Sequence, residues 1–300
     1  MLSDDFGNGL LNRTLRRDTE TGNFDFPDSV YLALLTEIPK RDTQPPTGEI
    51  EIGTAPNLTG YGRQELSFGE AAEQMALNDE EVEFDDVTED WTERNTDDVV
   101  ESPIIAQAIM TTNGMGQSDS QKGKWIFAEE ICPRIITAGK DPPVYRIKGI
   151  KVRFKFSECC IGSDYIVHKW LNAMLRGEDF NPPEKVYLAL LKTMPISSDT
   201  ELEEVSADNT GYERAEAVFS EAENQETENE EDVEFSRQTE DWATKDEPIV
   251  AVAAMTQPGS IGGDWLFAAE LDCPIIVKKD DPDVIISAGK IKIGFDCCDC

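Results

Sequence analysis

Short apolar runs, separated by polar segments that contain Gly and Pro, dominate the chain. The run Val-Tyr-Leu-Ala-Leu-Leu occurs twice, at 30–35 and at 186–191. A run of this length and composition, with a proline soon after it, is typical of a buried strand. At 150–156 apolar and basic residues alternate, so one face of this strand should be buried and the other exposed. Together with further short runs between turn residues, the pattern predicts a mainly β protein made of β-sandwiches.

A helical pattern precedes each copy of the repeated run. In the first copy, Leu10, Leu11 and Leu15 fall on one face of a helix. We expect Asp164 to cap the second helix and Gly177 to end it. The second segment places its apolar residues on one face in the same way, at Ile166, Trp170, Leu171, Met174 and Leu175.

The two halves of the chain share a series of short matches in the same order. Gly-Tyr-x-Arg, Val-Glu-Phe, Thr-Glu-Asp-Trp and Cys-Pro each occur once in each half. Such order predicts a duplication, with domains at 1–160 and 161–300. The expected fold is therefore two tandem homologous β-sandwich domains, each preceded by a short helix. The residues expected to anchor both copies are Tyr31, Tyr187, Tyr61, Tyr212, Arg63, Arg214, Trp91, Trp242, Trp125 and Trp265.

The repeated aromatic residues have two interpretations. Large rings that recur in both copies are expected to anchor the core, because each buries a large apolar area. The alternative is a binding face for sugars or partners. We expect the core role for Tyr61, Trp91, Trp125 and their matches in the second copy.

The charge of the chain limits its partners. There are 27 Lys plus Arg against 61 Asp plus Glu, which gives a net charge of −34. A surface this negative repels phosphate backbones and anionic lipids, and the sequence suggests no Lys or Arg cluster that would bind nucleic acid. No apolar run is long enough to span a membrane, and the first residues do not form a signal peptide. We therefore expect a soluble protein that binds neither nucleic acid nor membrane directly.

Carboxylates concentrate in two segments, 79–90 and 221–234, and the second has eight of them in fourteen positions. Clustered oxygens suit Ca²⁺, but neither segment has the twelve-residue loop of an EF-hand, with Asp at alternate positions and a central Gly. The favoured interpretation is a solvated loop in each half. Whether these loops bind Ca²⁺ stays open.

The sequence offers little catalytic chemistry. His168 is the single histidine, and no nucleophile, zinc or phosphate-loop motif accompanies it. We therefore predict no catalytic, cofactor-binding or metal-binding residues, and no enzyme activity. The seven cysteines are expected to be mainly free thiols, with Cys132 and Cys273 as small core residues. A metal site or disulfide through Cys297, Cys298 and Cys300 stays open.

The order of these motifs resembles a family of tailed-bacteriophage virion proteins. The resemblance rests on a helix, Val-Tyr-Leu-Ala-Leu-Leu, Gly-Tyr-x-Arg, Val-Glu-Phe and Asp-Trp, followed by Thr-Ala-Gly-Lys-Asp-Pro-Pro at 137–143 and Gly149. Val277-Lys278-Lys279-Asp280 replaces Thr-Ala-Gly in the second copy. The family consists of β-rich accessory proteins of the tail-fibre or head-decoration type, and the resemblance carries over no catalytic residues.

The resemblance implies a structural protein of a bacteriophage virion that decorates the capsid or forms part of the neck or tail. Its expected partners are other virion proteins, and self-contacts are included. Its expected location is the virion, assembled in the host cytoplasm. The alternative is a receptor-binding or glycan-binding module of a tail fibre. A glycan hydrolase is a third hypothesis that no residue pattern favours.

Overall fold

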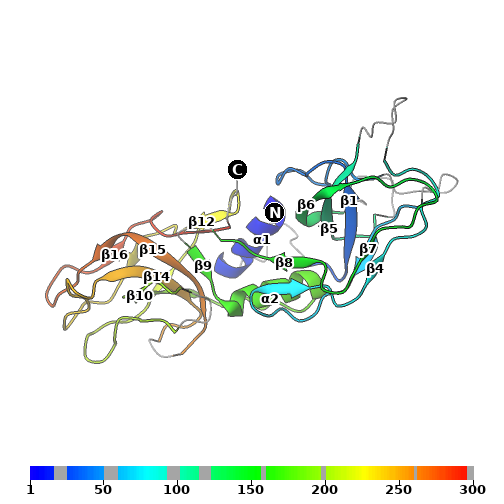
Figure 1. Ribbon diagram of the computed structural model, residues 1–300. Coiled ribbons are helices and arrows are strands. Elements are labelled where there is room, and N and C mark those ends of the chain that lie inside the picture. Colours follow the sequence, from blue (N-terminus) through cyan, green and yellow to red (C-terminus); the bar gives the residue numbers. More distant parts are fainter. Residues whose placement is uncertain are drawn as a thin grey trace. The chain divides into compact units, whose positions relative to one another are not determined.

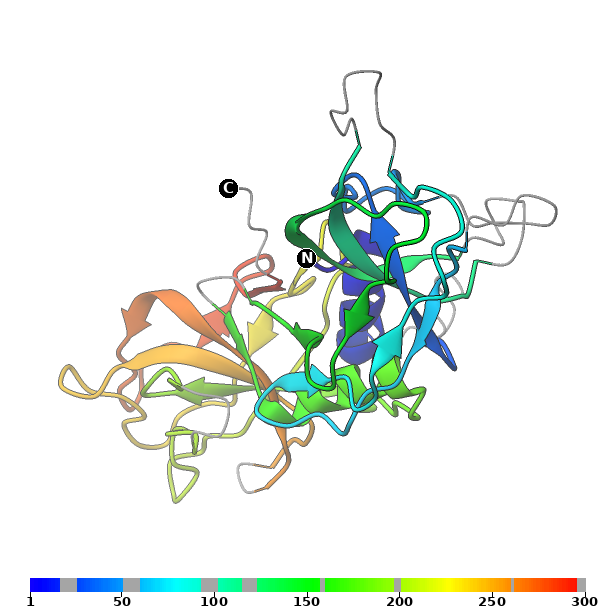
Figure 2. The same cartoon turned by 45° about the vertical axis from the view of Figure 1, so that its right-hand side comes forward.

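The structure is a computed structural model that describes residues 1–16, 26–50, 60–92, 102–114, 123–156, 160–196, 201–259 and 262–295 (Figures 1 and 2). Its helices are α1 (Asp4–Leu11), the π-helical turn η1 (Asn12–Arg16) and α2 (Asp164–Arg176). The strands of the first half are β1 (Val30–Leu35), β2 (Gln64–Leu66), β3 (Met75–Leu77), β4 (Val82–Glu83), β5 (Ile104–Met110), β6 (Trp125–Arg134), β7 (Val144–Tyr145) and β8 (Lys151–Arg153). Those of the second half are β9 (Cys160–Gly162), β10 (Val186–Leu191), β11 (Ala215–Ala217), β12 (Glu226–Glu228), β13 (Val233–Glu234), β14 (Ile249–Met255), β15 (Trp265–Ile275), β16 (Ile285–Ile286) and β17 (Lys292–Gly294). The prediction of a mainly β fold is confirmed.

The chain forms two compact units. Unit 1 consists of Met1–Phe6, Asp25–Arg153 and Leu171–Asp179. Unit 2 consists of Gly7–Phe24, Phe154–Trp170 and Phe180–Cys300. The units and the sequence halves are therefore two different divisions of the chain. Each unit holds the strands of one half together with a helical segment from the other half.

Unit 1 is built on an antiparallel sheet with the strand order β2-β1-β5-β6. The central strand β1 is Val-Tyr-Leu-Ala-Leu-Leu, and only Tyr31 in it is partly exposed. Ala33 on β1 and Ala108 on β5 are opposite one another in the ladder and belong to the same buried cluster. Small residues there allow the indole of Trp125 and other large side chains to fill the core at crystal-like density. Two two-stranded ladders, β3-β8 and β4-β7, complete the unit.

Unit 2 repeats this arrangement with one added strand. Its sheet has the order β11-β10-β14-β15-β9, and its ladders are β12-β17 and β13-β16. The register matches as well, since Val30 is opposite Leu66 in unit 1 and Val186 is opposite Ala217 in unit 2. The described strands that correspond in sequence therefore pair in the same order in both units.

Each helix contributes to the unit built on the other half. Asn12 of the first half lies in unit 2, and its side-chain oxygen accepts a hydrogen bond from the backbone N–H of Ala222 at 2.7 Å. Asn172 of the second half lies in unit 1, and its side-chain oxygen accepts one from Ala71 at 2.9 Å. The two asparagines correspond in sequence and so do the two alanines. Each unit thus uses a residue from the other half to satisfy a backbone donor that would otherwise be unpaired.

The predicted apolar faces of the helices are buried, including Leu10 and Leu11 of α1. The predicted cap of α2 was wrong. Ser163 accepts the hydrogen bond from the N–H of Ile166 at 3.3 Å, and Asp164 is the first helical residue. Gly177 follows the last residue of α2 with φ of 65°, which is the left-handed conformation that ends helices. Alternation at 150–156 is confirmed, because Ile150, Val152 and Phe154 are buried and the basic residues between them are exposed.

Replacing Asn172 with Ala should destabilise the protein, since the buried N–H of Ala71 loses its acceptor. We expect a loss of about 1 to 3 kcal/mol in the free energy of unfolding. Asn172→Asp keeps an acceptor oxygen and should retain more stability than Asn172→Ala. Urea denaturation of the two variants, with Asn12→Ala as the matched change in unit 2, measures this. An unchanged midpoint for Asn172→Ala would contradict a stabilising role for this hydrogen bond between the two halves of the chain.

Candidate functional site

A buried polar network lies beside the central strand of unit 1. Arg63 binds Glu49 through two parallel hydrogen bonds of 2.6 Å, and its third contact is with the carbonyl of Thr112 at 2.9 Å. The Arg63 side chain is 0% exposed and that of Glu49 is 11% exposed, so the ion pair is almost dry. The hydroxyl of Tyr61 accepts the N–H of Leu34 at 2.9 Å and donates to Glu49 at 3.4 Å.

The same network recurs in unit 2. Arg214 binds Glu204 through bonds of 2.9 and 2.7 Å and donates to the carbonyl of Gln257 at 3.1 Å. The hydroxyl of Tyr212 accepts the N–H of Leu190 and donates to Glu204, both at 2.9 Å. Two parallel N–H···O bonds between a guanidinium and a carboxylate are the strongest geometry for such a pair. We call these two clusters the Tyr-Arg-Glu networks.

Aromatic rings pack against the tyrosine of each Tyr-Arg-Glu network. The Tyr61 ring stacks on Phe84 with a centroid distance of 6.0 Å, and Trp91 meets it edge-on at 5.3 Å. These arrangements are favoured by the quadrupoles of the rings. In unit 2 the same stacked and edge-on contacts are made by Tyr212, Phe235 and Trp242.

Burial changes the acidity of the two tyrosines. Loss of solvent raises the pKa of Tyr61 well above its usual range, and the neighbouring Glu49 carboxylate raises it further. The pKa of Tyr212 is also raised by burial and by Glu204. Both hydroxyls therefore keep their protons at neutral pH and act as hydrogen-bond donors, not as bases.

The other predicted anchors occupy the sheets. Trp125 is fully buried on β6, and its indole N–H donates to the carbonyl of Thr43 at 2.7 Å. Its counterpart Trp265 is half-buried on β15, as are Tyr31 on β1 and Tyr187 on β10. The structure does not bring all ten predicted anchors into one site. Only the Tyr, Arg and Trp of the Gly-Tyr-x-Arg and Asp-Trp motifs come together, once in each unit.

Sequence reasoning missed Glu49 and Glu204, the acids that neutralise the two arginines. A signal was present, because each acid directly precedes an aliphatic residue, Ile50 or Val205, and lies upstream of Gly-Tyr-x-Arg. Those aliphatic residues donate their N–H groups to the central strand next to the network. In a chain with so many carboxylates, this signal does not stand out from the rest.

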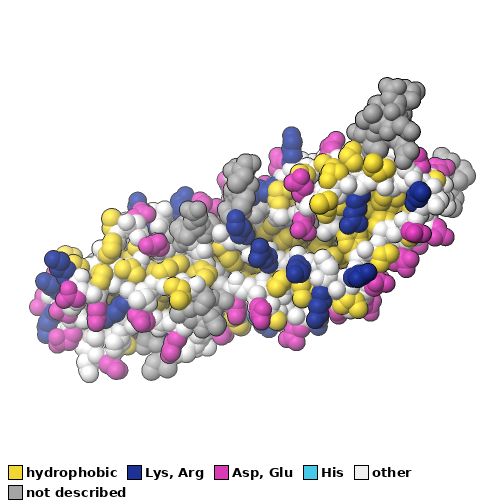
Figure 3. All heavy atoms as spheres, viewed as in Figure 1, with side chains coloured by type: hydrophobic (Ala, Val, Ile, Leu, Met, Phe, Trp, Pro, Cys, Tyr) yellow, Lys and Arg dark blue, Asp and Glu magenta, His cyan; other side chains and the backbone are white. Residues whose placement is uncertain are grey.

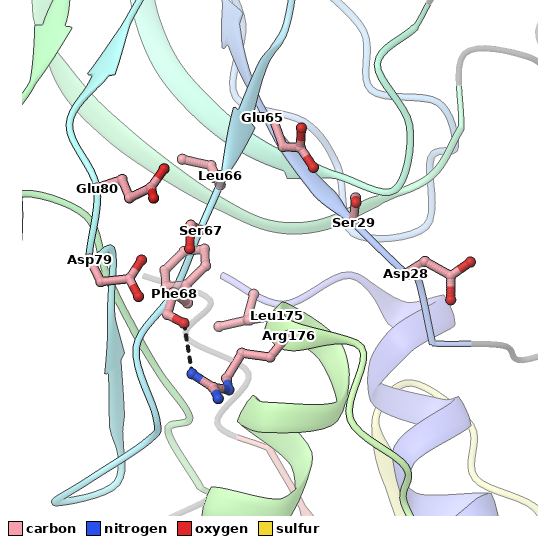
Figure 4. Close-up of a pocket in the computed structure, with 10 residues that line it drawn as sticks. All are labelled: Asp28, Ser29, Glu65, Leu66, Ser67, Phe68, Asp79, Glu80, Leu175 and Arg176. Carbon is pink, nitrogen blue, oxygen red and sulfur yellow. Dashed lines mark hydrogen bonds between the residues drawn. The ribbon is translucent and has the colours of Figure 1, made fainter.

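Unit 1 has an open cavity of about 470 Å³ between β2 and the end of α2 (Figure 4). Its charged lining consists of four carboxylates and one guanidinium, that of Arg176. This guanidinium donates to the carbonyl of Phe68 at 3.0 Å and pairs with Glu178 at 2.7 Å. Arg176 is therefore occupied by protein partners and is not poised for a ligand. The carboxylates that line the cavity are those of Asp28, Glu65, Asp79 and Glu80.

The acidic segments and cysteines give no metal centre in the part of the chain that the structure describes. The carboxylates of 79–90 are exposed, but neither acidic segment is a single loop, because 79–90 contributes β4 and 221–234 contributes β12 and β13. Cys132 and Cys273 are exposed, so the expectation that they lie in the core was wrong. They follow the point at which β6 and β15 leave the core. Cys159, Cys297, Cys298 and Cys300 lie outside the described residues.

Two further predictions can be compared with the described residues. His168 is half-buried on α2, at the edge of the core. None of the described helices has the length and apolar character needed to cross a membrane.

Unit 1 carries four exposed basic residues that lie close together in the sequence and that the sequence analysis did not single out. Arg146 and Lys148 lie in the turn before β8, and Lys151 and Arg153 lie on β8 itself, at alternate positions and therefore on the same face. All four are exposed, and none forms an ion pair with the described part of the chain. We call these four residues the basic strip. Figure 3 shows dark blue side chains gathered over β7 and β8, with yellow ones between them.

These observations define a mainly β protein of antiparallel sheets, in which each unit encloses a buried arginine–glutamate pair. Residues 162–294 match the family described as Gp80, podophage GP4 fiber I protein gp80. The matched segment extends from the end of β9 through α2 to β17. No curated protein gives a significant match to the chain.

Glu204→Gln should strongly destabilise the protein, because it leaves the buried charge of Arg214 without a counter-ion. Breaking a buried ion pair by removing one partner costs about 3 to 5 kcal/mol. Replacing both residues with Leu should recover part of this loss. The neighbouring exposed Glu203→Gln serves as the control and should stay within about 0.5 kcal/mol of the parent. Equal unfolding midpoints for Glu204→Gln and Glu203→Gln would contradict a stabilising role for the network.

The free energy of unfolding should fall as the pH rises above about 10, where tyrosines of the unfolded chain ionise. Tyr61 and Tyr212 keep their protons in the folded state, so there the unfolded state binds fewer protons and is favoured as pH rises. Below this pH both states are protonated and these groups give no slope. Tyr212→Phe should reduce the slope by up to about 1.4 kcal/mol per pH unit. Denaturation at several alkaline pH values measures it, and parallel curves for parent and variant would contradict the assignment.

Proposed function

We propose that this chain is a non-enzymatic structural protein of a bacteriophage virion and forms part of a fibre through protein–protein contacts. The observation that carries the proposal is the match of residues 162–294 to a podophage fibre family. A mainly β fold agrees with a structural role. The buried charged residues, those of the Tyr-Arg-Glu networks, bond to one another inside each unit.

We also propose that the chain is a tandem duplication, so that the fibre role extends to the first half. Three observations support this extension. The sheets have the same strand order in both units, with one added strand in unit 2. Both units have a Tyr-Arg-Glu network with the same contacts. Asn12 and Asn172 make matching contacts with Ala222 and Ala71.

Burial of the repeated aromatics favours the structural role over glycan binding. A glycan site on this chain was expected to use exposed rings from the set that recurs in both halves. Of these, Tyr61, Trp91, Tyr212, Trp242 and Trp125 are buried, and Trp265 is half-buried. Capsid decoration and a place in the neck are the other virion positions that the resemblance allows.

Immunogold electron microscopy of purified phage particles with an antibody against this protein tests the proposal. Label confined to fibres is the expected result. Label spread over the capsid would replace the fibre role with decoration, and particles without label would reject a virion role altogether. A parallel glycan array with the purified protein should give no specific binding, and a reproducible glycan signal would favour the receptor-binding alternative.

A further inference from the structure

The cavity of unit 1 between β2 and the end of α2 combines carboxylates with apolar side chains (Figure 4). The lining residues that are buried are all apolar, and they are Leu66, Phe68 and Leu175. The lining residues that carry carboxylates are all exposed, and they are Asp28, Glu65, Asp79 and Glu80. None of these four acids forms an ion pair with the part of the chain that the structure describes, the basic strip included. A volume of about 470 Å³ accommodates a long side chain together with its neighbours.

Arg176, the one base among the lining residues, does not neutralise these acids. Its guanidinium donates to the carbonyl of Phe68 at 3.0 Å and pairs with the carboxylate of Glu178 at 2.7 Å. Glu178 is not one of the residues that line the cavity. The positive charge of Arg176 is therefore matched outside the lining, and the four lining carboxylates keep a negative charge that a cation can satisfy.

The corresponding place in unit 2 holds a cation on one of these acids. The ladders β1-β2 and β10-β11 put Glu65 and Glu216 opposite the same tyrosine of the repeated run, so the two glutamates correspond. The ammonium of Lys185 lies 2.7 Å from the carboxylate of Glu216. Lys185 directly precedes β10, whereas the residue that directly precedes β1 is Ser29. Unit 1 therefore has a short neutral side chain at the position that supplies the ammonium in unit 2.

The lining of the cavity suits an ammonium group on an aliphatic stem. The methylene groups of a lysine lie against apolar side chains while its charged head stays among polar groups. This head donates hydrogen bonds to several separate acceptors, whereas the planar guanidinium of arginine matches a single carboxylate. Ca²⁺ needs about six to eight oxygens around one point. No group of acids in the described part of the chain converges in that way, so lysine fits better than a metal ion.

The charge of the whole chain distinguishes between two sources of such a lysine. The net charge is −34, so a second copy of this chain is repelled as it approaches. A basic protein is attracted by the same field. The occupant that agrees with both the cavity and the net charge is therefore a different, basic protein.

We propose that the cavity of unit 1 binds a lysine side chain of a basic partner protein, with the ammonium at Glu65. Lys185 and Glu216 are the equivalent pair within unit 2. Unit 2 thus fills this place with its own lysine, and unit 1 leaves it open for a partner. The proposal concerns unit 1 alone and does not depend on the fibre role, so each is able to fail without the other.

Methyl NMR of the full-length chain with labelled leucines tests the site directly, with Nα-acetyl-lysine amide as the probe. We expect the methyl signals of Leu66 and Leu175 to shift and to saturate with a Kd of about 1 to 10 mM, since the probe offers one charge and a short stem. Leu15 of unit 2 corresponds in sequence to Leu175 and is the internal control, so its signal should not move. Absence of saturable shifts, or equal shifts at Leu15, would overturn the proposal.

Related probes separate lysine from other cations. The same probe acetylated on its side-chain nitrogen keeps the stem but loses the charge, and it should bind about tenfold more weakly or worse. Ca²⁺ that gives the same shifts at lower concentration than the lysine probe would overturn the proposal in favour of a metal site. A two-lysine peptide is also compared with 1,4-diaminobutane, which has the same charge. Tighter binding of the diamine would overturn the choice of a protein partner and indicate a free polyamine.

Ser29→Lys transfers the lysine of unit 2 to unit 1. The new ammonium should occupy Glu65 from within the chain, so the affinity for the probe should fall about tenfold while the melting temperature does not fall. Glu65→Gln should weaken binding about fivefold. The control, Glu203→Gln, removes the same charge at an exposed site outside the cavity and should leave the affinity within about twofold. Equal affinity of Ser29→Lys and the parent, or equal weakening by the two glutamate variants, would overturn the proposal.

Discussion

A guanidinium removed from water has to be neutralised, and the way each unit meets this requirement fixes the course of its backbone. Arg63 holds Glu49, which brings the segment before residue 50 against the end of β1. There the neighbouring strand β2 has already ended, so Tyr61 takes the N–H of Leu34 that a longer β2 would have accepted. The Tyr-Arg-Glu network therefore replaces a missing piece of sheet. Strand length, loop course and aromatic packing all follow from it.

The identical run in β1 and β10 is explained by the same constraint. A strand buried on both faces, with one edge completed by side chains, tolerates little change in volume or polarity. The ladders at the surface are under no such restriction, because an exposed residue there can change without leaving a buried group unpaired. This difference explains why Glu226 and Glu228 correspond to Met75 and Leu77 while the interiors of the two units stay closely matched.

The periodicity of apolar residues predicted the features that depend on residues close together in the sequence. The mainly β fold, the buried helical faces and the alternation at 150–156 follow from local pattern. It did not reveal Glu49 and Glu204. Each acid lies more than ten residues from the central-strand leucine, Leu34 or Leu190, that bonds to the same tyrosine, and it resembles many other carboxylates in the chain. The basic strip was missed for a related reason. Arg146 and Arg153 join one surface only because the turn at 146–149 folds back onto Asn78.

The exchange of helices also sets the order in which the chain is able to fold during synthesis. The strands of unit 1 are complete by residue 153, but its acceptor for Ala71, Asn172, leaves the ribosome later. Asn12 is made early and meets its partner Ala222 only after more than two hundred further residues. At about 5 to 20 residues per second, the helical segment that holds Asn12 waits many seconds for that partner. Until then the apolar side chains of this segment lack the part of unit 2 against which they pack, so the docking of the segment is limited by the rate of translation.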